Sequence, residues 1–314
     1  MRILVSLAGL AIASAALGAA GEQTVSGDEI STTAQVGERE VTVRAEEIAP
    51  GIFFLSGAGG NMGLSVGEDG VFLVDDQYAP LTDAIRQVIA QITDQPVKFV
   101  LNTHWHADHT GGNENLGARG TVVVAHDNVR ARMSEEQFST FWQRTTDPSS
   151  PAALPVVTFS DTLTFHMNGL TIRAFHVSGA HTDGDAVVHF PEANVIHLGD
   201  IFFHQWYPYI DVSAGGSVRG TIAAVDMVLP LIDEDTVVIP GHGSTVSDRA
   251  GLTAYRDMLQ AVTDRIQVLI DEGRTLDEVQ AARPTTEWDP VWGQNFMTPE
   301  HFVRLVYGDL TGEL

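Results

Sequence analysis

The stretch Asn102-Thr103-His104-Trp105-His106-Ala107-Asp108-His109 restricts the choice of fold more than any other part of the chain. It follows residues 97–101, an apolar run that predicts a buried strand. In an extended segment, His104 and His106 point to the same side because successive side chains alternate. Asp108 and His109 lie one turn further on. The spacing predicts that the first pair binds one metal ion and that the second pair faces another.

Three later loops place similar side chains just after predicted strands. His181 follows the strand at residues 170–177, Asp200 ends the strand at 195–198, and His242 follows the strand at 236–239. Loops at strand ends are where α/β folds place their chemistry. Glycines next to these residues let the backbone turn sharply and bring each side chain inward. The sequence therefore predicts one site assembled from several loops.

Hydrophobic periodicity elsewhere predicts a layered α/β fold with helices at its C-terminal end. Strands are predicted at residues 52–56, 64–67, 71–75, 97–101, 121–125, 163–166, 170–177, 186–190, 195–198 and 236–239. Helices are predicted at residues 80–92, 221–231, 248–272, 276–282 and 298–307, and residues 127–141 are expected to be partly helical. The glycine-rich run at residues 57–63 predicts a mobile loop that covers the site.

The first 20 residues have the pattern of a secretory signal peptide. Arg2 precedes an apolar stretch that ends in small residues near Ala20. A membrane anchor is the alternative, but the second half of the stretch is mostly Ala and Gly and no basic flank follows. We expect cleavage, no stable membrane anchor, and a periplasmic or secreted protein. Residues 21–42 are then a loose N-terminal arm.

Composition excludes several classes of function. The 314 residues include 17 Lys+Arg against 41 Asp+Glu, a formal net charge of −24, so nucleic acid is not an expected partner. There is no cysteine, which excludes disulfides, thiolate nucleophiles and cysteine-based zinc sites. Any metal site must therefore use histidine and carboxylate. These ligands make two Zn(II) ions the default at a site outside the cytoplasm, with Fe or Mn as alternatives.

The order His-x-His-x-Asp-His, followed by His, Asp and His after successive strands, resembles the metallo-β-lactamase superfamily. The resemblance implies an αβ/βα sandwich at residues 43–245, with residues 246–314 as a C-terminal helical extension. It implies one metal site at His104, His106 and His181, a second at Asp108, His109 and His242, and Asp200 as the bridge. Asp75 matches a position that supports the ligands in this family; an ordinary strand-end cap is the alternative.

Such a site implies hydrolysis of an amide, ester, lactone or thioester in a small-molecule substrate. Two neighbouring ions activate a water molecule as nucleophile at neutral pH. Asp108 and Asp200 are the expected catalytic carboxylates, and Asp108 is expected to orient that nucleophile. The oligomeric state is left open by the sequence.

Two departures from the best-known lactamases leave the substrate open. Those enzymes carry a cysteine where this chain has Asp200 and a lysine where it has Phe203; the only lysine here is Lys98. An aspartate bridge resembles thioesterases of the glyoxalase II type, although the acidic C-terminal region fits glutathione poorly. We expect β-lactamase-type activity of the kind that confers antibiotic resistance. A thioester or lactone hydrolase and a non-catalytic metal-binding relay protein are the alternatives.

The aromatic segment at residues 202–209 is the expected substrate wall, with core packing as the alternative. His204, Tyr207 and Tyr209 are expected to donate hydrogen bonds to a developing oxyanion. Arg219 is expected to anchor a substrate carboxylate, with an ordinary surface arginine as the alternative. The predicted substrate contacts are Asn61, Phe203, His204, Trp206, Tyr207, Tyr209 and Arg219.

Overall fold

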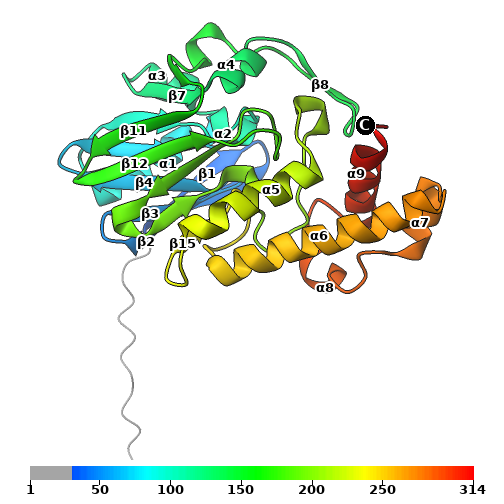
Figure 1. Cartoon of the computed structure of the whole chain (residues 1–314). Coiled ribbons are helices and arrows are strands. Elements are labelled where there is room, and N and C mark those ends of the chain that lie inside the picture. Colours follow the sequence, from blue (N-terminus) through cyan, green and yellow to red (C-terminus); the bar gives the residue numbers. More distant parts are fainter. Residues whose placement is uncertain (1–29) are drawn as a thin grey trace, which may run out of the picture.

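Two β-sheets pack face to face and carry helices on their outer faces in the computed structural model, which describes residues 30–314 (Figure 1). The eight-stranded sheet has the order β1 (Ile30–Val36), β2 (Arg39–Ala49), β3 (Ile52–Ser56), β4 (Met62–Gly67), β5 (Gly70–Val74), β6 (Val97–Leu101), β7 (Val122–His126) and β10 (Val157–Phe159). The five-stranded sheet has the order β11 (Thr162–Met167), β12 (Leu170–His176), β13 (Ala186–Phe190), β14 (Val195–His197) and β15 (Val237–Ile239). A separate hairpin joins β8 (Gln137–Ser139) and β9 (Arg144–Thr146).

The helices alternate with these strands in the first half and follow them in the second. They are α1 (Thr82–Ile92), α2 (Ala107–Thr110), α3 (Asn113–Gly117), α4 (Asp127–Met133), α5 (Val218–Val228), α6 (Arg249–Asp271), α7 (Leu276–Ala282), α8 (Asp289–Trp292) and α9 (Pro299–Thr311). Within residues 30–314, no helix combines the length and the apolar character needed to cross a bilayer. The predicted signal peptide at residues 1–20 lies outside the described residues.

Alternation of side chains along the buried strands divides the interior into layers. In β5, Phe72 and Val74 lie between the two sheets, whereas Val71 and Leu73 face the opposite way and pack with residues of α1. The strand is apolar throughout because both of its faces are covered. The predicted αβ/βα sandwich is therefore confirmed.

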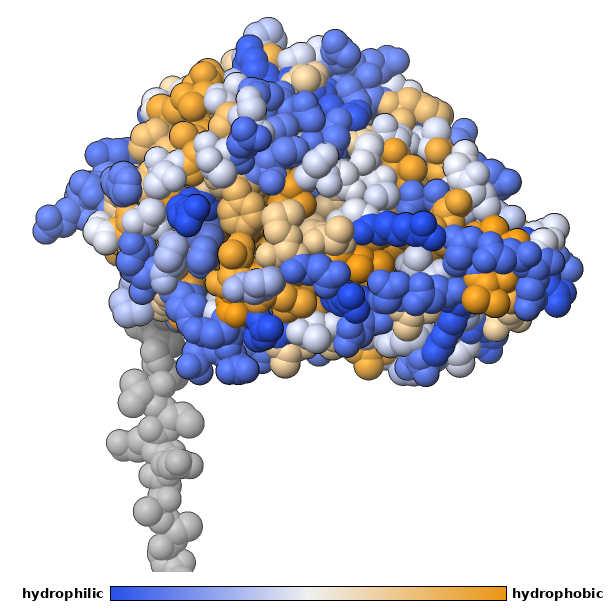
Figure 2. Space-filling view, viewed as in Figure 1, coloured by the Kyte–Doolittle hydropathy of each residue, from blue (hydrophilic) through white to orange (hydrophobic). Residues whose placement is uncertain are grey.

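The first helix of the predicted C-terminal extension covers the five-stranded sheet. Ile196 and Val238 point out of that sheet into a core that also contains Leu259 of α6 and Val225 of α5. The helix α6 is amphipathic, and its outer face forms part of the mixed hydrophilic and hydrophobic surface seen on this side of the molecule (Figure 2). The extension is thus packed against the sandwich.

The parallel strands bring their carboxyl ends to one edge of the sandwich. The strands β5, β6 and β7 run parallel to one another, as do β14 and β15. The loops that follow β5, β6, β14 and β15 therefore meet at one place, as the positions of the candidate ligand residues in these loops predict.

The prediction of a loose arm is wrong for residues 30–42. These residues form β1 and the start of β2, which pair from Ile30↔Ala45 to Val36↔Arg39. Ala34, Val36 and Val41 pack against the core under α1. The alternation of Val41, Val43 and Ala45 with polar residues was the available signal for a half-buried strand, and the prediction missed it. The structure also adds β10 and the hairpin β8–β9, which the sequence did not predict.

The packing of α6 predicts different effects for two side-chain truncations on the same helix. Leu259 is fully buried whereas Val268 is exposed. Leu259→Ala should lower the free energy of unfolding by about 2–5 kcal/mol, and Val268→Ala by about 0.5 kcal/mol or less. Denaturant unfolding followed by circular dichroism measures both. Equal losses for the two variants would contradict the packing of α6 on the sheet.

Candidate metal centre

Three imidazole nitrogens from two loops converge at the edge of the sandwich. His106 Nδ1 lies 3.1 Å from His104 Nε2 and 3.0 Å from His181 Nε2. Asp200 Oδ2 completes the group at 3.8 Å from His104 and 3.6 Å from His181. Two nitrogens bound to one tetrahedral zinc ion lie about 3.3 Å apart, so this spacing fits a cation between them.

A second group lies on the other side of Asp200. His242 Nε2 is 3.3 Å from Asp108 Oδ2 and 3.3 Å from Asp200 Oδ2. His109 Nε2 is 3.1 Å from Asp200 Oδ1 and 3.7 Å from Asp108 Oδ2. The two groups that could each hold a metal ion thus share the Asp200 carboxylate. The structure brings together all seven side chains that the sequence singled out as ligands.

The outer nitrogens of the histidines have acceptors that set their tautomers. His106 Nε2 lies 3.0 Å from Asp211 Oδ2, and His181 Nδ1 lies 2.9 Å from the Tyr209 carbonyl oxygen. A carboxylate and a carbonyl can only accept, so the N–H is on that side of each ring. The other nitrogen then presents its lone pair to the centre, which is the arrangement that metal-binding histidines use.

Asp75 orients the second group from behind. Its Oδ1 accepts the backbone N–H of Thr103 at 2.7 Å, and its Oδ2 accepts the Thr103 hydroxyl at 2.8 Å. The same Oδ2 is 2.8 Å from His109 Nδ1. Asp75 also has a positive φ of 60°, which is uncommon for a residue with a side chain. A simple strand-end cap would not contact a ligand ring, so Asp75 is a support of the site.

Close packing explains the glycines next to the ligands. A Cβ at Gly60 would overlap the His109 ring, and a Cβ at Gly241 would overlap Asp200 Oδ1. Gly60 also donates its N–H to the Asp108 carbonyl at 3.1 Å. The run at residues 57–63 therefore provides room for the ligands. Gly60 packs against a ligand ring, whereas Gly57 and Ala58 are exposed and line the cavity next to the site, as expected for a loop that covers it.

The buried polar atoms at the centre fit a metal ion. His109 Nε2 and Asp200 Oδ1 are both fully enclosed, and although they lie 3.1 Å apart they form no hydrogen bond with each other or with any other described group. Buried polar groups are normally satisfied, so such atoms call for a ligand. A divalent cation would satisfy both, and the donor set of imidazoles and carboxylates suits zinc, iron or manganese.

When no metal ion is bound, the pKa values of the histidines differ between the two groups. Burial lowers the pKa of His104, and it lowers the pKa of His181 to about 4, so both rings are neutral at pH 7. Burial acts the same way on His242, but Asp200 and Asp108 outweigh it and raise its pKa to about 9. In the absence of a cation, protons therefore take its place in the second group. Metal binding must release them, so acid weakens binding.

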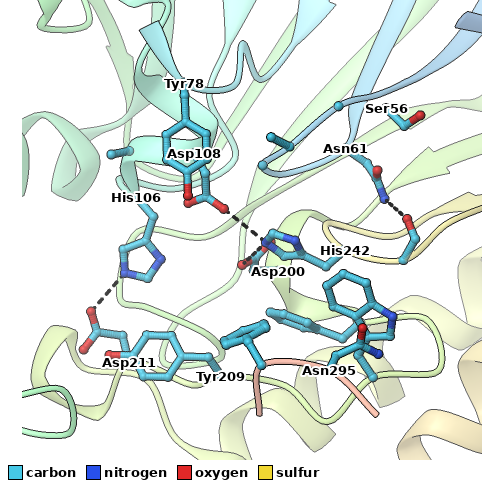
Figure 3. Close-up of a pocket in the computed structure, with 18 of the residues that line it drawn as sticks. Ser56, Asn61, Tyr78, His106, Asp108, Asp200, Tyr209, Asp211, His242 and Asn295 are labelled. Atoms are coloured by element: carbon cyan, nitrogen blue, oxygen red, sulfur yellow. Dashed lines mark hydrogen bonds and ion pairs between the residues drawn. The ribbon is translucent and has the colours of Figure 1, made fainter. Parts of the chain in front are cut away.

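The two groups open onto a cavity of about 800 Å³. Tyr78, His106, Asp108 and His242 point into it (Figure 3). Six further lining residues are aromatic, and their rings come from four separate segments of the chain. They are Trp105, Trp142, Phe203, Trp206, Tyr209 and Phe296. A cavity of this size and lining accepts a small molecule with an apolar body.

Four of the predicted substrate contacts line this cavity. Phe203 and Trp206 stack on the His242 ring, with centroid distances of 4.9 Å and 5.9 Å. The Tyr209 hydroxyl lies 3.1 Å from Ser139 Oγ. Asn61 also lines the cavity, but its amide donates to the carbonyls of Pro240 and Gly243 and so fixes the loop that carries His242.

The other three predicted contacts lie away from the cavity and are corrected. The Tyr207 hydroxyl donates to Asp289 Oδ1 at 2.9 Å in the C-terminal core. Arg219 is exposed on α5 and donates to Gln267. His204 faces the Thr245 carbonyl. Residues 202–209 form no strand that would set a regular alternation, so the sequence could not separate Tyr207 from Tyr209.

Sequence reasoning missed several residues of the cavity wall. Tyr78 follows the loop after β5, and Trp142 and Arg144 come from the hairpin β8–β9. Phe296 comes from the segment between α8 and α9. The aromatic residues Phe138, Phe141 and Trp142 within the otherwise polar run at 137–146 were the signal in sequence that could have indicated the hairpin.

Residues 56–264 match the sequence profile of the family described as Metallo-beta-lactamase superfamily. The chain belongs to this superfamily. The resemblance inferred from the histidine motif is thus confirmed. The superfamily comprises metal-dependent hydrolases of small molecules, and the two donor groups of this metallo-β-lactamase-fold chain suit that chemistry.

Its relatives differ in the substrates that their names state. A "Metallo-beta-lactamase type 2" of Bacteroides fragilis is 24% identical over 189 residues, which span 57% of this chain and 70% of the relative. A "Hydroxyacylglutathione hydrolase" of Erythrobacter litoralis is 31% identical over 108 residues, 34% of this chain and 35% of the relative. A double mutant of the sec-alkyl sulfatase PisA1 matches in structure with a TM-score of 0.66 and 19% identity, over 86% of this chain and 50% of that one. The last likeness concerns the fold alone.

Asp75 provides a test of how the second group is held. Asp75→Asn keeps the size of the side chain but removes the charge and an acceptor for His109. We expect the affinity for the second metal ion to fall about 10- to 100-fold. Competition with a chromophoric chelator measures it. Asp94→Asn, at an exposed loop position, is the control, and unchanged affinity in Asp75→Asn would show that Asp75 does not support the site.

Proposed function

We propose that this chain is a secreted dinuclear zinc hydrolase that opens the cyclic amide of β-lactam compounds. The observation that carries the proposal is the Asp200 carboxylate, which lies between two donor groups at the wall of an aromatic cavity. Zinc is proposed on the ligand chemistry, with iron or manganese as the alternatives. Sequence similarity to the Bacteroides fragilis lactamase supports the substrate class.

When bound, the pair of ions would supply a Lewis acid for the carbonyl group and an activated water molecule. Asp108 faces the cavity and holds its Oδ2 3.3 Å from His242 Nε2. We assign the Asp108 carboxylate the role of orienting the attacking water. Asp200 keeps the two groups in register through its two carboxylate oxygens.

Tyr78 is assigned as a hydrogen-bond donor at the same wall. Burial and the nearby Asp108 raise the pKa of its hydroxyl, so the group stays protonated at neutral pH. It therefore donates a hydrogen bond to the substrate carbonyl or to the departing nitrogen. The aromatic side chains around it exclude water from the reacting bond.

A thioester or ester hydrolase on the same site is the second candidate. Asp200 stands where the best-known lactamases have a cysteine, and the similarity to a hydroxyacylglutathione hydrolase favours this reading. The chemistry at the metal ions is the same for both substrates. The difference lies in what the cavity wall binds.

The activity is tested on the zinc-loaded full-length protein. We expect turnover of a chromogenic cephalosporin, loss of turnover with a chelator, and recovery on adding zinc, measured by absorbance. A panel with a lactone and an aryl thioester runs beside it. Faster hydrolysis of the thioester would favour the second candidate, and no turnover of any substrate would contradict both.

His106→Ala serves as the active-site variant in this panel. It removes one donor of the first group, so bound metal and turnover should both fall. His166→Ala, an exposed histidine on β11, is the matched control and should keep both. Unchanged metal content in His106→Ala would mean that the site is assigned wrongly.

Secretion is proposed on the signal-like pattern of residues 1–20. Expression of the full chain in a Gram-negative host should give a periplasmic protein whose N-terminus begins near Gly21. Fractionation followed by mass spectrometry of the purified protein checks this. Recovery of the protein from the membrane fraction with residues 1–20 intact would instead favour an anchor.

A further inference from the structure

The hairpin β8–β9 stands apart from both sheets and is held at both ends. It leaves α4 and reaches the C-terminal helix α9 (Figure 1). At its base, Gln137 accepts from Arg132, whose guanidinium makes two bonds of 2.8 and 2.7 Å to Asp183. At its tip, Arg304 of α9 donates to the Phe141 carbonyl at 2.8 Å and lies 4.0 Å above the Phe141 ring. These contacts hold the hairpin in a defined position.

One side of this hairpin forms part of the cavity wall. Ser139, Trp142, Arg144 and Thr146 all line the cavity. The Trp142 ring packs at 5.6 Å from the Tyr209 ring, and the Tyr209 carbonyl in turn holds His181. The hairpin is therefore joined to the metal centre through a single intervening residue.

Arg44 and Arg144 are the two arginines that line the cavity. The carboxylates of Asp108, Asp200 and Asp211 each lie within 4 Å of at least one histidine nitrogen. Arg144 makes no ion pair or side-chain hydrogen bond with residues 30–314, and its side chain is exposed to the cavity. A guanidinium with five donors and no acceptor is left available in a chain whose net charge is −24.

Tyr78 lies near both Arg144 and the metal centre. Burial and Asp108 raise the pKa of the Tyr78 hydroxyl, and Arg144 acts on the same hydroxyl in the opposite direction. Tyr78 is therefore within electrostatic reach of both residues. An anionic group bound at Arg144 would leave the rest of a small substrate over Tyr78 and the metal centre.

We propose that Arg144 binds a carboxylate of the substrate, so that this hydrolase selects small molecules with an apolar body and one anionic end. The inference rests on the proposed function and names the substrate class for it. A guanidinium binds a carboxylate through two parallel hydrogen bonds. The ring of Trp142, two residues earlier, contacts the apolar body.

This assignment also accounts for the missing lysine. The position three residues after Asp200 is Phe203, whose ring stacks on His242 and cannot hold an anion. Arg144 approaches the cavity from a different element of the fold. The chain thus supplies a cationic group at the cavity even though its only lysine, Lys98, lies on β6 and does not line it.

The test compares binding of phenylacetate and phenylacetamide to the zinc-loaded full-length protein by calorimetry. The two probes have the same aromatic body and differ in charge. The wild type should prefer phenylacetate, and Arg144→Gln should reduce that preference about tenfold, as expected for the loss of one charge-assisted pair. Arg144→Lys should keep part of the preference because it keeps the charge.

Arg173→Gln is the matched control, since Arg173 is an exposed arginine on β12 that does not line the cavity. The same preference in the wild type and in Arg144→Gln would overturn the inference, as would an equal loss in Arg173→Gln. Metal ions are present in every variant, so their own attraction for the carboxylate cancels in the comparison.

Kinetics separate this inference from the proposed function. On a chromogenic cephalosporin, Arg144→Gln should raise KM about tenfold, whereas kcat/KM for the methyl ester of the same compound should not change. Turnover with equal KM in both proteins would sustain the hydrolase and refute the role of Arg144. A phenylacetate preference that depends on Arg144, without turnover of any substrate, would refute the hydrolase alone.

Discussion

The buried carboxylate of Asp75 accepts hydrogen bonds from the Thr103 backbone, the Thr103 hydroxyl and the His109 ring. It therefore joins the end of β5 to the loop after β6, which carries four of the ligand side chains. The next two residues of the chain join the same loop to further segments. Asp76 accepts the N–H of Gly112, and Gln77 accepts the N–H of Gly59. One short loop thus fixes the position of the ligand loop and of the glycine-rich loop that packs against it.

The ligand positions were predictable from sequence because each lies at or just after an apolar run that predicts a strand. The runs at residues 97–101, 170–177, 195–198 and 236–239 were predicted as strands, and β6, β12, β14 and β15 are there. Parallel neighbours then bring the following loops to one edge. The distances that join the two groups, and the place of Asp200 between them, follow from tertiary packing and needed the structure.

The cavity wall was less predictable, and the reason lies in its irregular backbone. Residues 202–209 contain several aromatic rings but no regular period, so Tyr207 points into the C-terminal core and Tyr209 into the cavity. Trp142 and Phe296 reach the same space from segments that are far apart in the chain. Arg144 gave no signal in sequence, because an isolated arginine in a polar run is most often a solvated surface residue.

The tip of the hairpin β8–β9 is held by α9, which follows the last metal ligand in the chain by more than 50 residues. The metal ligands lie between His104 and His242, whereas one wall of the cavity depends on Arg304 near the C-terminal end. Part of the cavity wall thus depends on a helix, α9, that carries no ligand side chain. Substitutions in the hairpin or in α9 can therefore change the shape of this wall while the seven ligand side chains stay in place.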